Sequence, residues 1–112
     1  MRYMMLIHHD EESLAKAPAS LGSDYAAFNA ALAKAGGTPG ERLQPSRAAT
    51  TVRVKDGKHN VLDGPYSDTK EQLAGYFIID VPDLDQAIAW AARCPSSQFG
   101  SIEIRPMWVS KG

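Results

Sequence analysis

A run of polar and charged side chains between residues 63 and 71 is the richest candidate for chemistry in this sequence. It supplies carboxylates, hydroxyls and an ammonium group from Asp63, Tyr66, Thr69, Lys70 and Glu71. Such a mixed set suits a small anionic or carbonyl-bearing ligand, and loops rich in charged groups often host binding sites. The same groups could instead pair across a dimer interface. A third role is a rigid corner, because the residue before Pro65 is restricted and Asp63 can accept bonds from nearby backbone amides.

Two adjacent histidines, His8 and His9, stand before Asp10-Glu11-Glu12 and suggest a metal site. Adjacent residues of a strand point to opposite faces, so both imidazoles cannot bind one ion without a bend. The chain also has no second cluster of cysteine and histidine that would complete four ligands, and we predict no metal. Because imidazole titrates near neutrality, one histidine facing a cleft could act as a general base, and His8 is the candidate.

The single cysteine, Cys94, could be a nucleophile only if a base or a positive field lowered its pKa. Arg93 adjoins it, but no histidine is near in sequence, so we expect a buried and inert thiol. The chain has no phosphate-binding glycine loop, no nucleotide fingerprint and no Ser-His-Asp arrangement. No cofactor is therefore expected.

Composition limits the class of protein further. The 112 residues suffice for one domain, taken here as 1–112, and the hydrophobic fraction of 44% is ordinary for a globular protein. Twelve basic and thirteen acidic residues give a net charge of −1, which argues against a nucleic-acid partner. The apolar run over residues 3–7 is too short for a secretory signal or a membrane span. With one cysteine and no such segment, we expect a cytoplasmic protein without a membrane partner.

The first half of the chain predicts a strand, a helix and a short strand. The strand, over residues 2–8, is apolar on both faces, with Met4 and Leu6 on one and Tyr3, Met5 and Ile7 on the other. Residues 10–22 form a polar connection. Ser23 is the predicted cap of a helix that ends at Gly36-Gly37, and a strand follows over residues 41–43. The helix has an apolar stripe of Tyr25, Phe28, Leu32 and Ala35.

The second half predicts a hairpin, a buried strand, a helix and a last strand. Asp56-Gly57 is typical of a two-residue turn, so residues 50–54 should pair with residues 59–63, with Val52 opposite Val61. The apolar run over residues 73–81 predicts a central strand. Asp83 should cap a helix that Pro95 ends. Its predicted stripe is Leu84, Ala87, Ile88 and Ala91, and the last strand covers residues 101–108.

This order predicts a ferredoxin-like α+β fold with an added hairpin. Right-handed crossovers place both helices on one face of the sheet. The first and central strands are apolar on both faces, so something else must cover the second face. A second copy of the same sheet is the simplest cover, and we predict a homodimer.

The segment Asp63-Gly64-Pro65-Tyr66 resembles the name motif of the DGPF subgroup in the YCII-related family, with Tyr66 in place of phenylalanine. The likeness continues through the apolar run to Asp80-Val81-Pro82-Asp83 and on to Arg105-Pro106, so it covers nearly the whole chain. It implies a dimeric α/β barrel, largely uncharacterised members, and relatives joined to or encoded near sigma factors of the extracytoplasmic-function type. Shorter relatives carry a proposed histidine–aspartate pair. In this chain the first predicted helix contains no histidine, and the second ends at Cys94-Pro95. The proposed pair is therefore missing, and its chemistry is not carried over.

Two functions remain open at this point. The favoured one is binding of a small molecule in a cleft between sheet and helices, with or without catalysis. The alternative is a non-catalytic dimeric accessory or regulatory module linked to sigma-factor-type transcription regulation.

Overall fold

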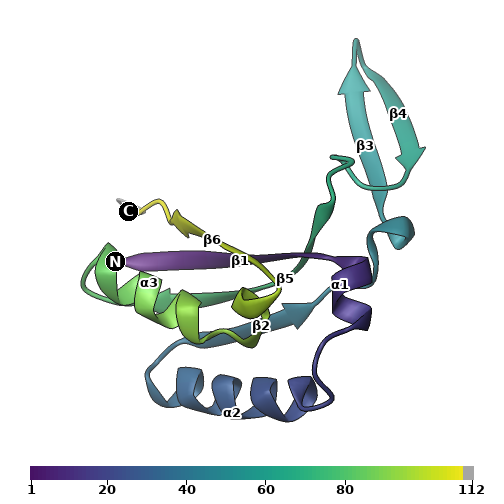
Figure 1. Cartoon of the computed structure of the whole chain (residues 1–112). Coiled ribbons are helices and arrows are strands. Elements are labelled where there is room, and N and C mark those ends of the chain that lie inside the picture. Colours follow the sequence, from purple (N-terminus) through teal and green to yellow (C-terminus); the bar gives the residue numbers. More distant parts are fainter. Residues whose placement is uncertain (110–112) are drawn as a thin grey trace.

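A four-stranded antiparallel sheet carries the helices on one face. The structure, a computed structural model, describes residues 1–109. The sheet has the strand order β2-β5-β1-β6, with β1 at Arg2–Asp10, β2 at Thr38–Arg42, β5 at Glu71–Asp80 and β6 at Gly100–Pro106. The long helices α2 (Leu21–Lys34) and α3 (Leu84–Arg93) lie on the same side of this sheet (Figure 1). This arrangement confirms the predicted ferredoxin-like α+β fold.

The core lies between the sheet and the two long helices. Along β1, the odd-numbered residues are buried against the helices, and β5 contributes Phe77 and Ile79 from its neighbouring register positions. Helix α2 contributes Phe28 and Leu32, and the rings of Phe28 and Phe77 meet edge to face with centroids 5.2 Å apart. The alternating burial pattern of β1 fixes which side chains reach the helical side.

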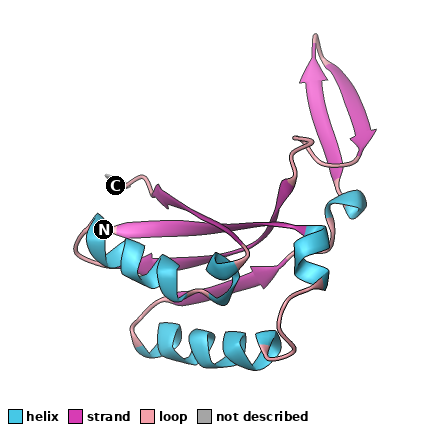
Figure 2. Ribbon diagram, in the orientation of Figure 1, coloured by secondary structure: helices cyan, strands magenta, loops and turns pink. Residues whose placement is uncertain are grey.

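Three short helical turns lie outside the two long helices (Figure 2). Helix α1 (Glu11–Ala15) follows β1 directly, because the Asp10 side chain accepts a hydrogen bond from the Glu12 amide at 3.0 Å. The 3-10 turns are η1 (Ser46–Ala48) and η2 (Pro95–Gln98). The sequence gives no strong periodic pattern for a helix of five residues, and α1 was expected only as a polar connection.

Several predicted helix details need correction. Helix α2 begins at Leu21 with Ser20 as its N-cap, and the Ser23 hydroxyl donates back to the Ser20 carbonyl instead of capping. Asp83 does cap α3, since its side chain accepts from the Gln86 amide at 2.9 Å. The predicted stripes are only partly buried. Ala35, Leu84 and Ile88 are exposed, while Trp90 packs against the core instead.

The strand boundaries also differ from prediction at several ends. Strand β1 continues to Asp10, β5 begins at Glu71, and β6 covers Gly100–Pro106, two residues short of the expected end. Strand β2 begins at Thr38 and ends at Arg42, where residues 41–43 were expected. Its irregular pairing with β5 explains the difference, because a strand that shifts register has no simple alternation.

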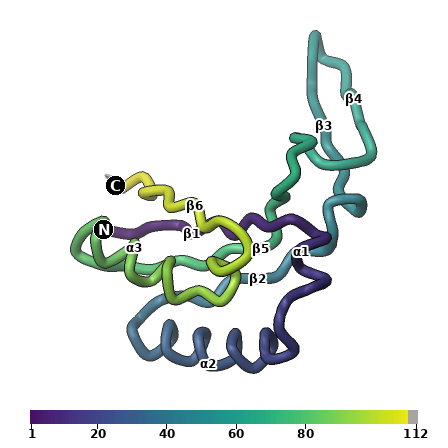
Figure 3. Tube along the Cα trace, in the orientation of Figure 1, coloured from purple at the N-terminus to yellow at the C-terminus, as the bar shows by residue number. Residues whose placement is uncertain are grey.

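The predicted hairpin is confirmed and projects from the sheet as an arm (Figure 3). Strands β3 (Thr50–Lys55) and β4 (Lys58–Asp63) form a separate two-stranded sheet with Val52 opposite Val61. Asp56 and Gly57 both have positive φ, at 52° and 76°, as a two-residue hairpin turn requires. We call this pair of strands the arm.

The face of the sheet turned away from α2 and α3 carries no long helix of the described chain, and only the short turn η1 lies at its end beside the arm (Figure 1). Met4 and Leu6 of β1 stand opposite Ile78 and Tyr76 of β5, and all four side chains are half-buried. We call these four residues the open face. Among residues 1–109, no helix has the length and apolar character needed to cross a membrane.

Candidate functional site

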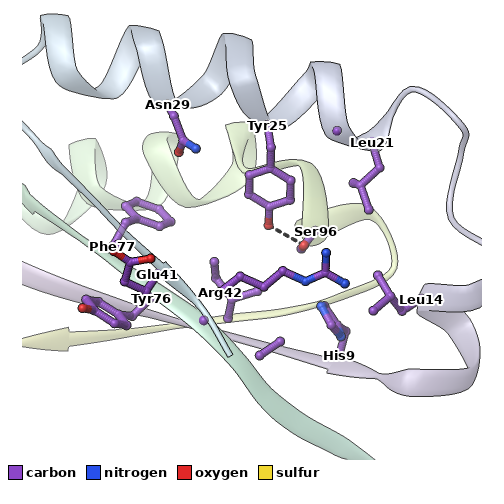
Figure 4. A pocket seen from close by; sticks show the side chains of 15 residues that line it. His9, Leu14, Leu21, Tyr25, Asn29, Glu41, Arg42, Tyr76, Phe77 and Ser96 are labelled. Carbon is purple, nitrogen blue, oxygen red and sulfur yellow. Dashed lines mark hydrogen bonds between the residues drawn. The ribbon is translucent and has the colours of Figure 1, made fainter. Parts of the chain in front are cut away.

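A pocket of about 320 Å³ lies between helix α2 and the sheet (Figure 4). We call it the α2 pocket. Helix α2, strands β1, β2 and β5, helix α1 and the turn η2 all contribute to its wall. Its apolar lining includes Ile7, Leu14, Leu21 and Phe77, and its polar lining includes His9, Tyr25, Asn29, Glu41, Arg42 and Ser96.

His9 is the buried polar group of this pocket. It follows Tyr3, Met5 and Ile7 on the face of β1 turned towards the helices, and it is 7% exposed. Its ring lies 5.6 Å from that of Phe99, and its buried Nδ1 atom has no hydrogen-bond partner among the described residues. Burial lowers the pKa of His9 from its ordinary value of 6.5, and the positive charge of Arg42 acts in the same direction. His9 is therefore a neutral imidazole at pH 7.

Arg42 reaches the pocket because β2 is irregular. The pairing of β2 with β5 shifts between Pro39 and Arg42, and Gly40 lies so close to the Tyr76 carbonyl that a side chain would collide with it. Such a bulge places consecutive side chains where regular alternation would not. As a result, both Glu41 and Arg42 line the pocket, and Figure 4 draws the Arg42 side chain extending towards His9 and Ser96.

A hydroxyl and thiol cluster closes the pocket beneath α2. The Tyr25 hydroxyl is hydrogen-bonded to Ser96 Oγ and lies 3.4 Å from Cys94 Sγ (Figure 4 shows the Ser96 bond). Burial raises the pKa of Tyr25 and that of the Cys94 thiol. Both groups therefore stay protonated at neutral pH, so they offer hydrogen bonds and no thiolate nucleophile. The prediction of a buried Cys94 is confirmed, since it is 1% exposed.

A second pocket lies where the arm joins the sheet, and it collects most of the residues that the sequence singled out. Its volume is about 570 Å³, and we call it the arm-base pocket. His8, Tyr66, Thr69 and Glu71 all line it. The His8 ring is 3.1 Å from Glu103 Oε1, on the face opposite to His9. The structure therefore brings four of the predicted site residues together, on the side of the sheet away from the α2 pocket.

Within this loop, many polar groups bind one another. Thr69 Oγ1 donates to the Glu71 carbonyl at 2.7 Å, and the Glu71 carboxylate accepts from the Ser101 hydroxyl at 2.6 Å. Tyr66 is 79% exposed and lies under the Arg53 guanidinium. Gly64, with φ of 110°, donates its amide hydrogen to the Ala49 carbonyl. These contacts fix the corner between the arm and β5.

Asp63 and Lys70, the other two predicted site residues, are outside the lining of both pockets. Asp63 is the last residue of β4 and pairs with Thr50 across the arm. The Lys70 side chain is 84% exposed, with its ammonium group 3.9 Å from Asp10 Oδ2. The assignment of Asp63, Tyr66, Thr69, Lys70 and Glu71 to ligand binding stays a prediction.

The sequence alone does not show that His9 and Arg42 are neighbours in one pocket. Alternation along β1 shows that only one of the two histidines faces the helices, but both faces of the strand are apolar, so it does not show which one. No sequence motif marks Arg42, because it lines the pocket only through the irregular pairing of β2 with β5, and its side chain stays exposed. Gly40 was the available signal, since an isolated glycine in a strand often marks a bulge.

The chain is thus a small α+β protein with a ferredoxin-like sheet, an inserted hairpin and a pocket under its first long helix. Comparison with known proteins places the chain more narrowly. The model of the YCII-related domain matches residues 1–111, so the chain belongs to the YCII-related family. A segment of 75 residues, 65% of this chain, is 41% identical to an uncharacterised protein, R00369, of Rhizobium meliloti (strain 1021). That segment spans 60% of the length of the relative.

Proposed function

We propose that this protein binds a small organic molecule in the α2 pocket. The observation that carries the proposal is a pocket of about 320 Å³ between helix and sheet, whose mostly apolar wall holds the polar side chains of His9, Tyr25 and Arg42. Pockets with apolar walls and a few convergent polar groups are the usual form of small-molecule sites.

A variant that fills the pocket tests this proposal. Gly22 lines the α2 pocket in the first turn of α2, and a Cβ atom added there meets no atom within 4 Å. Gly22→Phe should therefore fold at least as well as the wild type, since glycine is a poor helix residue, while its ring occupies the pocket mouth. Ala30→Phe, on the exposed side of the same helix, is the matched control.

The measurement is a thermal-shift screen over a broad metabolite library. A ligand at 100 times its dissociation constant stabilises the native state by about 2.7 kcal/mol, which raises the melting temperature by several degrees. We expect hits that stabilise the wild type and Ala30→Phe but leave Gly22→Phe unchanged. Hits that stabilise Gly22→Phe equally would place binding elsewhere. A library without any hit would favour the non-catalytic regulatory module instead.

We also propose that the working unit is a homodimer in which two open faces meet. Support comes from the half-buried Met4, Leu6, Tyr76 and Ile78, which have no layer over them within the described chain. Glu103 and Arg105 flank this face, and one acid beside one base lets two copies meet without net repulsion. The arm extends on the same side and would lie beside the partner.

Within the family, we propose that the chain belongs to the DGPF subgroup. The support is the segment Asp63-Gly64-Pro65-Tyr66, whose Gly64 adopts the positive φ of the corner before β5. We place the protein in the cytoplasm, because its single cysteine is buried and requires no oxidising compartment.

A further inference from the structure

The α2 pocket has its charges at different ends. Figure 4 draws the Arg42 guanidinium on the side of His9 and Ser96, and the Glu41 side chain beside Tyr76 and Phe77. No ion pair joins Arg42 to any carboxylate of residues 1–109. A positive charge over a partly enclosed pocket, with no acid on it, is a site for an anionic group.

The shape of the guanidinium narrows the choice of anion. Its planar fork of N–H donors matches the two oxygens of a carboxylate, and such bidentate contacts are among the strongest charge-assisted hydrogen bonds. His9 lines the same side of the pocket, with its Nδ1 atom enclosed behind the wall and without a hydrogen-bond partner in the described chain. The Arg42 end of the pocket therefore presents one positive charge, with the Glu41 carboxylate at the other end of the lining, and it suits a ligand with one anionic group at the Arg42 end.

The remaining wall describes the body of the ligand. Ile7, Leu14, Leu21 and Phe77 are apolar, and a volume of about 320 Å³ is at the small end for organic ligands. The Glu41 carboxylate at the far end would repel a second anionic group. These features favour one acid group on a short aliphatic or aromatic body, in preference to a diacid or a phosphate ester.

Building on the proposed function, we propose that the ligand of the α2 pocket is a small monocarboxylic acid with an apolar body. Its carboxylate binds the Arg42 guanidinium on the side of the pocket that His9 lines, while its body lies against Phe77 and Leu21. Neither Arg42 nor His9 belongs to the set Asp63–Glu71, and neither lines the arm-base pocket, so the two sites are distinct.

Matched acids and amides test the ligand class. The probes are hexanoate, benzoate and 3-phenylpropionate, each compared with its own primary amide by calorimetry or ligand-observed NMR at pH 7. The two forms have nearly the same shape and differ in charge. We expect at least one acid to bind the wild type, at least tenfold more tightly than its amide.

Variants of Arg42 test whether this residue causes the tighter binding of the acid. Arg42→Gln should remove the tenfold advantage of the acid, whereas Arg42→Lys should keep part of it, because the charge stays and the fork is lost. Arg47→Gln is the control, since Arg47 lies in η1 outside the lining of the α2 pocket and should leave both affinities unchanged. Circular dichroism verifies that each variant folds.

The outcomes separate the ligand class from the pocket. Amides that bind the wild type as tightly as acids, or acids that do not bind at all, overturn the monocarboxylate proposal, and this comparison needs no variant. If Gly22→Phe abolishes binding of acid and amide alike, while Arg42→Gln leaves the ratio of their affinities unchanged, the result supports the α2 pocket as the binding site. It contradicts the proposal that the ligand is a carboxylic acid bound by Arg42. Acid binding that survives in Gly22→Phe overturns both.

Discussion

Cys94 shows at the scale of a single residue how burial decides chemistry. Its thiol is enclosed beneath α2, 3.4 Å from the Tyr25 hydroxyl. Removal from water disfavours the thiolate, so burial raises the pKa of the thiol above its ordinary value of 9.0. A raised pKa means that the folded state holds this proton more tightly than the unfolded state. The associated stability is complete below pH 9 and is lost as the pH rises towards the raised folded pKa.

Cys94→Ser should therefore fold and should flatten the alkaline part of the stability profile. In the wild type, the unfolded thiol ionises above pH 9 while the folded one does not, which lowers the free energy of unfolding by up to about 1.4 kcal/mol per pH unit. Serine does not titrate there, and its hydroxyl lies where the Tyr25 hydroxyl can hydrogen-bond to it, so the loss of stability should be small. Urea unfolding of both proteins at pH 8 and pH 10 measures the difference. If the free energy of unfolding falls equally between pH 8 and pH 10 in both proteins, the thiol is not buried in solution.

The two histidines show what residue-level prediction could and could not reach. Period-two alternation correctly separated His8 from His9, because neighbours on a strand face opposite sides. It could not choose between the faces, since Met4 and Leu6 are as apolar as Met5 and Ile7. Burial by α2 makes the difference, and burial depends on contacts far apart in the sequence. His8 meets Glu103 on the open side, whereas His9 enters the α2 pocket.

At the scale of elements, the arm stands out because its apolar side chains do not pack against the rest of the described chain. Val52, Val54 and Val61 share one face of the hairpin, and each is more than half exposed. An isolated two-stranded hairpin is marginally stable in water, and its apolar face gains from a partner. In the described chain these three side chains form no part of the core.

Val61→Glu tests whether the arm contributes to assembly. Because Val61 is 57% exposed in one copy, the change should alter the stability of the monomer by about 0.5 kcal/mol or less. Burying the new charge against a partner should weaken dimerisation at least tenfold. Asn60→Glu introduces the same charge on the opposite face of β4 and should have little effect. Equal dimer dissociation constants for the two variants would remove the arm from the interface.

The elements differ in how far the sequence determines them. The pairing of residues in the arm was predictable from the sequence. Asp56-Gly57 favours the positive φ values of a two-residue turn, and the turn fixes which residues of the two strands face each other. Helix ends were less predictable: Ser20 and Ser23 can both cap, and only packing of α2 on the sheet decides between them. The stripe of α3 failed at Leu84 and Ile88, which the hydrophobic spacing places near Ala87 but the sheet does not reach.

At the scale of the whole molecule, the shape is more extended than its length predicts. The radius of gyration is 16.0 Å, and the extents are 46 × 45 × 19 Å. A compact chain of this length would have a radius of roughly 13 Å. The arm, which projects from the sheet, accounts for the excess (Figure 3). The placement of both helices on one face of the sheet was predictable from rules of topology, whereas the direction in which the arm projects was not, because a hairpin turn fixes only the pairing of its own two strands.

The dimer is the prediction that belongs to this scale. Sedimentation at micromolar concentration should show a species of twice the monomer mass, because the open face and the exposed valines of the arm offer apolar surface of the kind that marks protein–protein contacts. Leu6→Glu, at the centre of the open face and next to Glu103 in the neighbouring strand, should yield a folded monomer. Ile88→Glu changes an equally apolar residue on the outer side of α3 and should remain dimeric. A wild-type monomer would sink the two-sheet assembly, and a dimer disrupted by Ile88→Glu but not by Leu6→Glu would move the interface to the helices.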